Sequence, residues 1–576
     1  MTSHVDFSQK QADKKSTGIY GFDDITGGGL PEIGLTAVTG GPGAGKTVFA
    51  LQTVFSRLIR HGERAIVVSF EDPAAQLLRD VASFAWGNGD FGPEEIRIVE
   101  AKLPIDAIAS GDFDLSSLLA GLLAIKKDIG ARNIVFDGID ALLSGLPDGR
   151  QERRELSRLN DWVRGAELFG LLTVKSEGVT ERDQERSDYI LYNTRCVVSL
   201  NVDLGQTSLM RNLRVIKYRG SGFAADPMPL VITSAGIEIV SFSGVRLSYP
   251  TYDERLSSGI PRLDASLGGG YLRGSSILVS GAPGTSKTSL GASFLASACE
   301  AGKTGLLVSF DESASQIVAH MRSIGLDLAS HVRSGALVIE SYQASNLSPV
   351  DHFVTLRSLI GARTPGCLVI DPLSALQRRD NPFSLMVCEV LFDLAREHGI
   401  TMLCTSLLDR VAGDQELAGG HVSTLADTWL HVSYLADEGE RNRALTIVKS
   451  RGTSHSNQVR ELTLSDSGLD LVDVYAAGGE VLMGSARAER EARDRQVGIL
   501  ATIDQRHKRF ALDRSVADFE AVARKAAEDL VWKRREVAVL EENENARLTS
   551  EEDTATSRVR LRGGTDDAPI ATTGAP

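Results

Sequence analysis

The feature that most constrains the fold is the run GGPGAGKT at residues 40–47. A short apolar run, 35–38, precedes it, and a helix-like run, 48–59, follows it. This is the phosphate-binding loop pattern GxxxxGK[ST] in its strand–loop–helix context. Glycines let backbone N–H groups surround phosphate oxygens, and the start of the helix adds partial positive charge. We therefore expect Lys46 to reach the outer phosphates of a nucleotide and the Thr47 hydroxyl to ligate Mg²⁺.

The same pattern returns, with one substitution, as GAPGTSKT at residues 281–288. Lys287 lies 241 residues after Lys46. The lead-in segments also match, because STGI at 16–19 and SSGI at 257–260 are each followed by three consecutive glycines. The chain is therefore a tandem duplication of one nucleotide-binding domain.

Composition limits the class of protein. The chain has 576 residues, 42% hydrophobic and 24% charged, which is typical of a soluble globular protein of about two to four domains. A net charge of −14 argues against a protein that coats nucleic acid non-specifically, although it is compatible with a local basic groove. The five scattered cysteines form no CxxC pair, so we expect reduced thiols and no zinc site. With no apolar signal segment, and with an apolar run at 115–125 of about half the length of a membrane span, we expect a cytoplasmic protein without membrane contact.

Strand-like and helix-like runs alternate through the first half. The expected strands are 34–40, 65–70, 96–100, 133–137 and 171–175, and the expected helices are 46–60, 73–84, 115–128 and 151–168. This alternation predicts an α/β fold in which a mostly parallel sheet carries helices on both faces. Ligands of such sheets bind at the carboxyl ends of the strands.

Two acidic features recur at such strand ends. Glu71-Asp72 and Asp311-Glu312 follow apolar runs, and Asp137 and Asp371 end the apolar runs 133–137 and 367–371. Adjacent carboxylates suit the orientation of a water or hydroxyl, so the four paired acids are candidate catalytic residues. The alternative for them is a solvated acidic segment at a helix start. The strand-terminal aspartates fit the Walker-B pattern, which makes Thr47, Asp137, Thr288 and Asp371 candidate Mg²⁺ ligands.

A third recurring feature is K-x-R-G, at Lys217 to Gly220 and at Lys449 to Gly452. Residues two apart on a strand share a face, so Lys217 and Arg219 point the same way, as do Lys449 and Arg451. Such a pair can neutralise charge on a transferring phosphoryl group. We expect it at the nucleotide edge with the other features. The alternative is an exposed basic edge that discourages strand pairing.

Together these residues resemble the KaiC family over about residues 16–485. The resemblance implies two tandem RecA-like P-loop NTPase domains, with ATP and Mg²⁺ as cofactors. It also implies a double-ring homohexamer with ATP between subunits, in which each K-x-R pair reaches the neighbour's nucleotide. The expected nucleotide contacts are Gly41, Gly43, Ala44, Gly45, Lys46, Thr47, Lys217, Arg219, Gly284, Thr285, Ser286, Lys287, Thr288, Lys449 and Arg451.

The second half carries a further match. HVSTLADT at residues 421–428 resembles the family segment that holds adjacent Ser and Thr phosphorylation sites. The resemblance implies that Ser423 and Thr424 are phosphoacceptors of a serine/threonine autokinase, whereas the first half has Ser187-Asp188 at the matching place. Arg378, seven residues after Asp371, also resembles a family arginine near this site. The leading hypothesis is an ATP-hydrolysing, self-phosphorylating hexamer that acts as a signalling or timing switch.

Two substitutions distinguish the second half. Ser286 replaces the last loop glycine, which costs on the order of 1–2 kcal/mol if the backbone there is left-handed. Asp311 stands where the family has glutamate, so its carboxylate is one methylene shorter, whereas the first half keeps Glu71. We therefore expect the first half to be the better ATPase and the second half a slower kinase.

The C-terminal region departs from the family. Residues 488–545 are rich in Glu, Arg and Ala. Within them, apolar residues recur at heptad-like spacing, and Lys533 is the one polar interruption. This apolar stripe consists of Leu512, Val516, Phe519, Ala523, Ala526, Leu530, Val537 and Leu540. This predicts either a helix packed on the ring, or a coiled coil or partner-docking helix. It differs from the short peptide that the clock protein offers its partner, which favours a relative outside the cyanobacterial clock. The expected divisions are a loose segment 1–15, domains 16–245 and 246–485, a helical tail 486–545 and a disordered end 546–576.

Two other functions share the fold. A RecA-like DNA motor, such as a recombinase or helicase, would bind DNA in a salt-sensitive way. The closest basic stretch, residues 150–164, interleaves arginines with acids and is typical of a solvated helix, so nucleic acid is not an expected partner. A scaffold in which ATP only joins subunits would show intact hexamers with negligible turnover.

Overall fold

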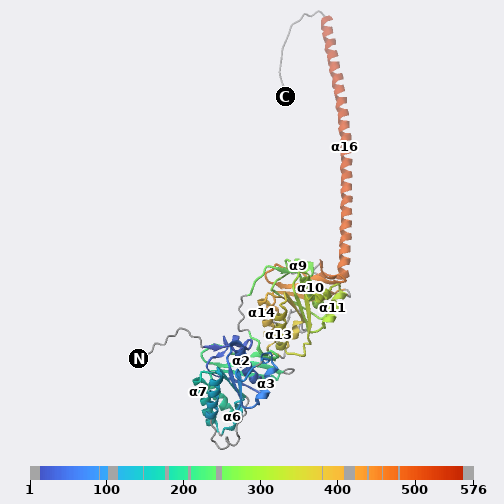
Figure 1. Cartoon of the computed structure of the whole chain (residues 1–576). Helices are drawn as coiled ribbons and strands as arrows, with labels where there is room; N and C mark the ends of the chain where they lie inside the picture. Colours follow the sequence, from blue (N-terminus) through green and yellow to red (C-terminus); the bar gives the residue numbers. More distant parts are fainter. Residues whose placement is uncertain are drawn as a thin grey trace, which may run out of the picture. The chain divides into compact units, whose positions relative to one another are not determined.

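The computed structural model describes residues 13–89, 91–101, 115–146, 148–175, 181–204, 209–241, 249–378, 381–407, 422–437, 440–456, 458–477 and 480–561. The chain divides into two compact units, Met1–Val474 and Tyr475–Pro576. The first contains both repeats and the second contains the tail (Figure 1). Of the predicted loose and disordered ends, 1–12 and 562–576 lie outside the described residues.

The first repeat is built on a nine-stranded sheet in the order β11-β10-β9-β8-β3-β7-β6-β4-β5. The strands from β8 to β5 run parallel, and β9, β10 and β11 continue the sheet antiparallel. Their bounds are β3 Gly34–Gly40, β4 Ala65–Ser69, β5 Ile96–Glu100, β6 Asn133–Asp137, β7 Phe169–Lys175, β8 Cys196–Leu204, β9 Leu209–Tyr218, β10 Met228–Thr233 and β11 Gly236–Ile239.

Helices cover both faces of this sheet. Phe49 of α2 (Lys46–His61) is buried with Val67 of β4 on one face. Leu119 of α5 (Ser116–Ile129) is buried with Ile66 of β4 on the other, together with residues of α7 (Gly149–Gly165). Successive strand residues point to opposite faces, so each face of β4 contributes to a different core. The predicted doubly covered α/β sheet is confirmed.

The second repeat has the same strand order, β16-β15-β17-β18-β14-β19-β20-β21-β22. Its strands are β14 Ser276–Gly281, β15 Gly305–Ser309, β16 Leu337–Ser341, β17 Cys367–Asp371, β18 Thr401–Leu407, β19 Thr428–Asp437, β20 Glu440–Ser450, β21 Arg460–Ser465 and β22 Gly468–Asp473. Because each strand has a counterpart at the same place in the first sheet, the duplication inferred from the two loops extends through the whole fold.

The remaining elements are short strands and connecting helices. They are β1 Lys14–Lys15, α1 Phe22–Thr26, β2 Leu30–Pro31, α3 Ala74–Ala82, η1 Ala85–Gly87, α6 Asp140–Gly145, α8 Glu181–Asn193, β12 Arg255–Leu256, α9 Pro261–Ser266, β13 Tyr271–Leu272, α10 Lys287–Glu300, α11 Ala314–Ser323, α12 Leu328–Ser334, α13 Pro349–Arg363, η2 Leu373–Leu376, α14 Ser384–Glu397, α15 Val422–Leu425, β23 Tyr475–Ala477 and β24 Glu480–Leu482.

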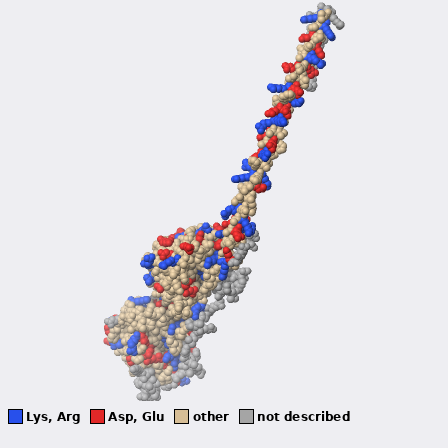
Figure 2. Space-filling view, turned by 90° about the vertical axis from the view of Figure 1, so that its right-hand side faces the viewer, with Lys and Arg blue, Asp and Glu red and all other residues tan. Residues whose placement is uncertain are grey.

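The tail is one continuous helix, α16, from Gly484 to Leu561. Every residue from 495 to 561 is exposed, so the predicted apolar stripe is uncovered along the described helix. Acidic and basic side chains alternate along it (Figure 2), and several form pairs four residues apart, such as Arg547–Glu551. The disorder expected from residue 546 was wrong as far as Leu561. Polar composition suggested disorder there, but the segment lacks proline and glycine and retains ion-pair spacing.

Among the residues that the structure describes, no helix combines the length and the apolar character that crossing a membrane requires. All five cysteines are buried and unpaired.

Candidate functional site

The first phosphate loop joins β3 to α2. Gly45 has φ 98° at the start of the helix, and a Cβ there would lie 2.9 Å from Ile232 Cδ1, so the position needs glycine for both conformation and space. The Lys46 ammonium donates to the carbonyl oxygens of Gly40 at 2.8 Å and Gly41 at 2.9 Å. Burial lowers the pKa of Lys46. A partly buried cation folded against loop carbonyls is well placed to exchange them for phosphate oxygens.

A hydroxyl and a carboxylate meet beside this loop. Thr47 donates to Asp137 Oδ1 at 3.1 Å, and Thr173 at the end of β7 donates to the same oxygen at 2.7 Å. Burial raises the pKa of Asp137, and the nearby charges of Asp72 and Glu71 raise it further. Hydroxyl and carboxylate oxygens are ligands that Mg²⁺ prefers, so the donor set fits that ion. Bound Mg²⁺ would favour the charged carboxylate that burial disfavours.

The second loop repeats the arrangement. Lys287 donates to the carbonyls of Gly281 at 2.9 Å and Ala282 at 2.8 Å, and burial lowers its pKa. Thr288 donates to Asp371 at 2.6 Å, and Thr405 of β18 donates to the same carboxylate. The two halves therefore hold equivalent sets of lysine, threonine and strand-terminal aspartate.

In the second loop, serine replaces glycine at a position whose backbone conformation serine disfavours. Ser286 has φ 71° and ψ 30°, in the left-handed region, and its side chain makes no capping bond to α10.

We expect Ser286→Gly to raise the free energy of unfolding by about 1 kcal/mol and to tighten ATP binding at the second loop. Urea denaturation and nucleotide titration measure both. The matched control is Gly45→Ala, which should destabilise the first half. An unchanged stability of the Ser286→Gly variant would contradict the strain.

The acidic pairs lie at the same strand ends but differ in their partners. Glu71 accepts a hydrogen bond from Lys175 at 2.6 Å, and Asp72 N donates to Ser69 Oγ at 3.1 Å. In the second half Glu312 pairs with His320 at 2.9 Å. Burial, followed by the charges of Asp371 and Glu312, raises the pKa of Asp311. Both leading acids therefore lie within electrostatic reach of the Walker-B aspartate and the loop lysine.

The K-x-R pairs do not lie with these groups, which corrects the expectation of a common edge. Tyr218 pairs with Cys196, and Cys196 pairs with Thr36, four residues before Gly40 on β3. Four residues of strand span about 13 Å. The pair sits at the opposite edge because β9 runs antiparallel, which no local pattern reveals. There Arg219 donates to Tyr192 O at 2.6 Å, at the end of α8.

The second K-x-R pair and the proposed phosphoacceptors share that opposite edge in the second half. Ser450 pairs with Thr428, whereas the loop residue Gly281 pairs with Val432. Ser423 and Thr424 lie on α15, immediately before β19, where Thr424 is exposed. Arg451 donates to Thr424 O at 3.0 Å. Ser423 and Thr424 are therefore next to Arg451 and remote from the loop of their own chain.

Two residues near the site were missed by sequence reasoning. Arg211 donates to Gly43 O at 3.2 Å, and Arg443 donates to Gly284 O at 3.4 Å. Both stand six residues before the lysine of K-x-R, so comparing the repeats would have found them. Of the other expected loop residues, Ala44 is buried, Thr285 donates to Ala282 O, and Arg378 lies after η2 with its N–H bonded to Ser384.

The stretch considered for DNA binding is α7, where two acids are buried rather than solvated as expected, whereas Asp161 is exposed. Glu152 and Glu155 are 2% and 0% exposed. Arg186 pairs with Glu152 at 2.8 Å and Arg158 with Glu155 at 2.9 Å. Arginines that neutralise buried carboxylates contribute less charge to a phosphate backbone.

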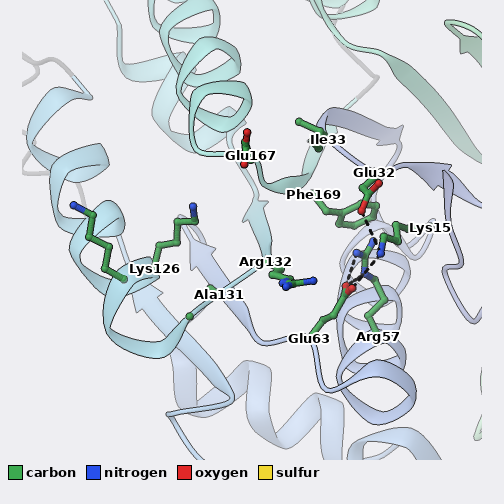
Figure 3. Close-up of a pocket in the computed structure, with 12 residues that line it drawn as sticks. Lys15, Glu32, Ile33, Arg57, Glu63, Lys126, Ala131, Arg132, Glu167 and Phe169 are labelled. Atoms are coloured by element: carbon green, nitrogen blue, oxygen red, sulfur yellow. Dashed lines mark hydrogen bonds and ion pairs between the residues drawn. The ribbon is translucent and has the colours of Figure 1, made fainter. Parts of the chain in front are cut away.

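A separate hollow of about 490 Å³ opens at the amino ends of the first sheet, away from the phosphate loop. Figure 3 shows Lys15 between Glu32 and Glu63, with Arg57 against Glu63. The ammonium of Lys15 lies 3.2 Å from the Glu32 carboxylate and 3.3 Å from that of Glu63, and the Arg57 guanidinium lies 2.5 Å from the Glu63 carboxylate. Since the phosphate loop follows the carboxyl end of β3, whereas this hollow lies where the strands begin, the hollow is not part of the nucleotide site.

Comparison with known proteins agrees with this construction. The model of the KaiC ATPase family matches residues 15–243 and 256–475, one match for each repeat. The circadian clock protein KaiC2 of a Synechocystis strain is 35% identical over 92% of this chain and 94% of its own length. The circadian clock oscillator proteins KaiC of Parathermosynechococcus lividus and Synechococcus elongatus are each 32% identical, over 82% and 84% of this chain and 88% and 94% of their own lengths. The chain belongs to the KaiC family of ATPases.

Proposed function

We propose that this KaiC-family ATPase is an autophosphorylating signalling or timing switch of the cytoplasm. Its family implies ATP binding. Thr47 with Asp137, and Thr288 with Asp371, would hold Mg²⁺, and the bound ion would supply positive charge to stabilise the phosphates. In this proposal the first half hydrolyses ATP at steady state, and the second half transfers phosphate to Ser423 and Thr424.

One observation carries the proposal: Arg451 and Thr424 touch at the edge of the sheet that lies about 13 Å from their own phosphate loop. In a ring, each subunit presents one edge to the next, so a heterologous interface can bring this edge to the neighbour's loop. The residue that neutralises the phosphoryl group and the hydroxyl that accepts it would then arrive together. A double-ring hexamer meets this requirement in both repeats.

The division of labour follows from the differences between the two sites. The side chain of Glu71 in the first site is longer than that of Asp311 in the second. The first phosphate loop has Gly45 before its lysine, whereas the second has Ser286, which is in the left-handed region. A general base must come within hydrogen-bond reach of the proton that it accepts, so one missing methylene slows the second site. Slow transfer to a protein hydroxyl suits a switch that stores its state, and the clock names of the relatives support a timing role.

The tail provides a surface for a protein partner or a second helix. Its apolar stripe, including Leu512, Phe519 and Leu540, is exposed throughout, and such a stripe is stabilised when another helix covers it. The sequence of the tail and the exposure of its apolar stripe support this partner, which is proposed independently of the nucleotide chemistry.

The test is the intact mass of purified protein after incubation with Mg-ATP, followed by mapping of the modified residues. We expect added phosphate on Ser423 or Thr424, and no added phosphate in a Lys287→Ala variant. The Lys46→Ala variant is the matched control, since the second site should still load ATP. ATP hydrolysis with no added mass would refute the autokinase and leave a ring ATPase whose second half does not transfer phosphate.

A further inference from the structure

Lys175 is a cation beside the first phosphate loop that none of the sequence motifs includes. It is the last residue of β7 and pairs in register with Gly40, where the loop begins. Its backbone N–H donates to Asp140 Oδ2 at 2.7 Å, which fixes the strand end, and its ammonium donates to Glu71 Oε1 at 2.6 Å. The side chain is 48% exposed, so the pair opens to solvent and its partners can exchange.

Glu71 reaches Lys175 by crossing the end of β6. Gly138 follows Asp137 with φ 71°, and a Cβ at Gly138 would lie 2.7 Å from Glu71 Cγ. A side chain there would push Glu71 aside. The glycine therefore lets the Glu71 side chain pass the end of the Walker-B strand and reach Lys175.

The second half lacks this arrangement at the corresponding positions. Leu407 ends β18 and pairs with Gly281, in the register that Lys175 has opposite Gly40. Pro372 stands where the first half has Gly138, and the leading acid is Asp311. All three members of the Glu71–Gly138–Lys175 set thus differ together, which is expected if they serve one role specific to the first site.

Two cations converge on the region of the outer phosphates. Lys175 pairs in register with Gly40, whose carbonyl oxygen accepts a hydrogen bond from the Lys46 ammonium at 2.8 Å, so the two like charges lie at the same strand end and repel each other. Such mutual repulsion is relieved when an anion binds between the two ammonium groups. The terminal phosphate of ATP carries more negative charge than one carboxylate and has several acceptor oxygens. The flexible stem of lysine allows its ammonium to move between nearby partners.

We propose that Lys175 contacts the terminal phosphate of ATP at the first site and, when that phosphate is absent, pairs with Glu71 and holds it away from catalysis. Binding of ATP draws the ammonium to the γ-phosphate and leaves Glu71 free to orient the attacking water. The role of Glu71 rests on the proposed function above. The phosphate contact does not, because it concerns binding.

The contact is tested by nucleotide affinity in the Lys287→Ala background, where the first site dominates binding. Calorimetry would compare ADP with the non-hydrolysable β,γ-imido analogue of ATP. Loss of a charge-assisted hydrogen bond in Lys175→Met should weaken analogue binding about tenfold. ADP binding should stay within about twofold, because ADP lacks the γ-phosphate. Lys175→Arg should retain most of the preference, and Lys127→Met, which removes an exposed lysine at the end of α5, should leave both affinities unchanged.

A second variant separates competition from a structural role. Glu71→Gln removes the charge that competes for Lys175, so analogue binding should tighten by about threefold, and the double variant with Lys175→Met should lose this gain. Equal weakening of ADP and analogue in Lys175→Met, or no change in either, would overturn the proposal. If the background protein binds the analogue with the expected preference but does not hydrolyse ATP, the proposed function fails while the role of Lys175 stands.

Discussion

Lys46→Ala is expected to lower steady-state ATP hydrolysis by roughly a hundredfold, the effect of removing one preorganised charge from a developing phosphoryl anion. Lys287→Ala should leave most of the hydrolysis intact. The reason is the asymmetry of the two sites: the first has Glu71, the longer of the two proposed bases, and Gly45 in the loop, whereas the second has Asp311 and Ser286, which lies in the left-handed region. Phosphate release by each variant, measured under saturating Mg-ATP, checks the expectation.

The measurement needs a control for assembly, because nucleotide bound between the subunits of the proposed ring would also stabilise that ring. Size-exclusion chromatography of both variants with Mg-ADP shows whether rings persist. Equal hydrolysis by the two variants, in rings of equal size, would contradict the assignment of steady-state turnover to the first half.

The second large effect concerns complementation between subunits. A Lys217→Ala, Arg219→Ala double variant and the Lys46→Ala variant should each be nearly inactive alone, whereas rings reassembled from an equal mixture should recover about a quarter of wild-type hydrolysis. In such rings one interface in about four joins an intact loop to an intact K-x-R pair, because the two defects come from different chains.

The distance between the two edges makes this experiment decisive. Register places Lys217 opposite Val197, which pairs with Ala37, three residues before Gly40 at the start of the loop. A pair acting within its own chain could not be rescued, because every intact loop in the mixture belongs to a chain with a defective pair. A mixture that stays as inactive as its components, although the rings contain both chains, would refute action between subunits.

Five parallel strands of the first repeat and the phosphate loops of both repeats could be predicted because their signals are local. An apolar run ending at Asp137, or glycines before Lys46, specify a strand end or a phosphate loop through residues a few positions apart. The predicted bounds of β3, β5 and β6 are those observed. The left-handed backbone at Ser286 was anticipated for the same reason, since its counterpart is the loop glycine Gly45.

The location of the K-x-R pairs could not be predicted from the same kind of signal. An apolar run before Lys217 indicates a strand but not its direction, and direction depends on pairing with β8. The resemblance to the family placed these residues near a neighbour's nucleotide, which is compatible with the observed edge, whereas the reasoning from strand ends placed them at the wrong one. Predictions based on strand ends hold only for the parallel strands.

Single residues at strand ends were missed for a different reason. Thr173 and Thr405 both donate to a Walker-B aspartate, and each is an unremarked threonine within an apolar run. Their recurrence is visible once the repeats are aligned on the structure. Lys175 has no counterpart in the second half, so only its contact with Glu71 reveals it.

We propose that one chain does not contain a complete catalytic site, because its K-x-R pairs lie at the opposite edge of the sheet from its own loops. The most direct measurement is ATP turnover per chain in separated monomers and rings, with mass photometry to verify each species at the assay concentration. We expect that rings turn over ATP and that monomers show only background turnover. Monomers that hydrolyse ATP at the rate of the ring would contradict it.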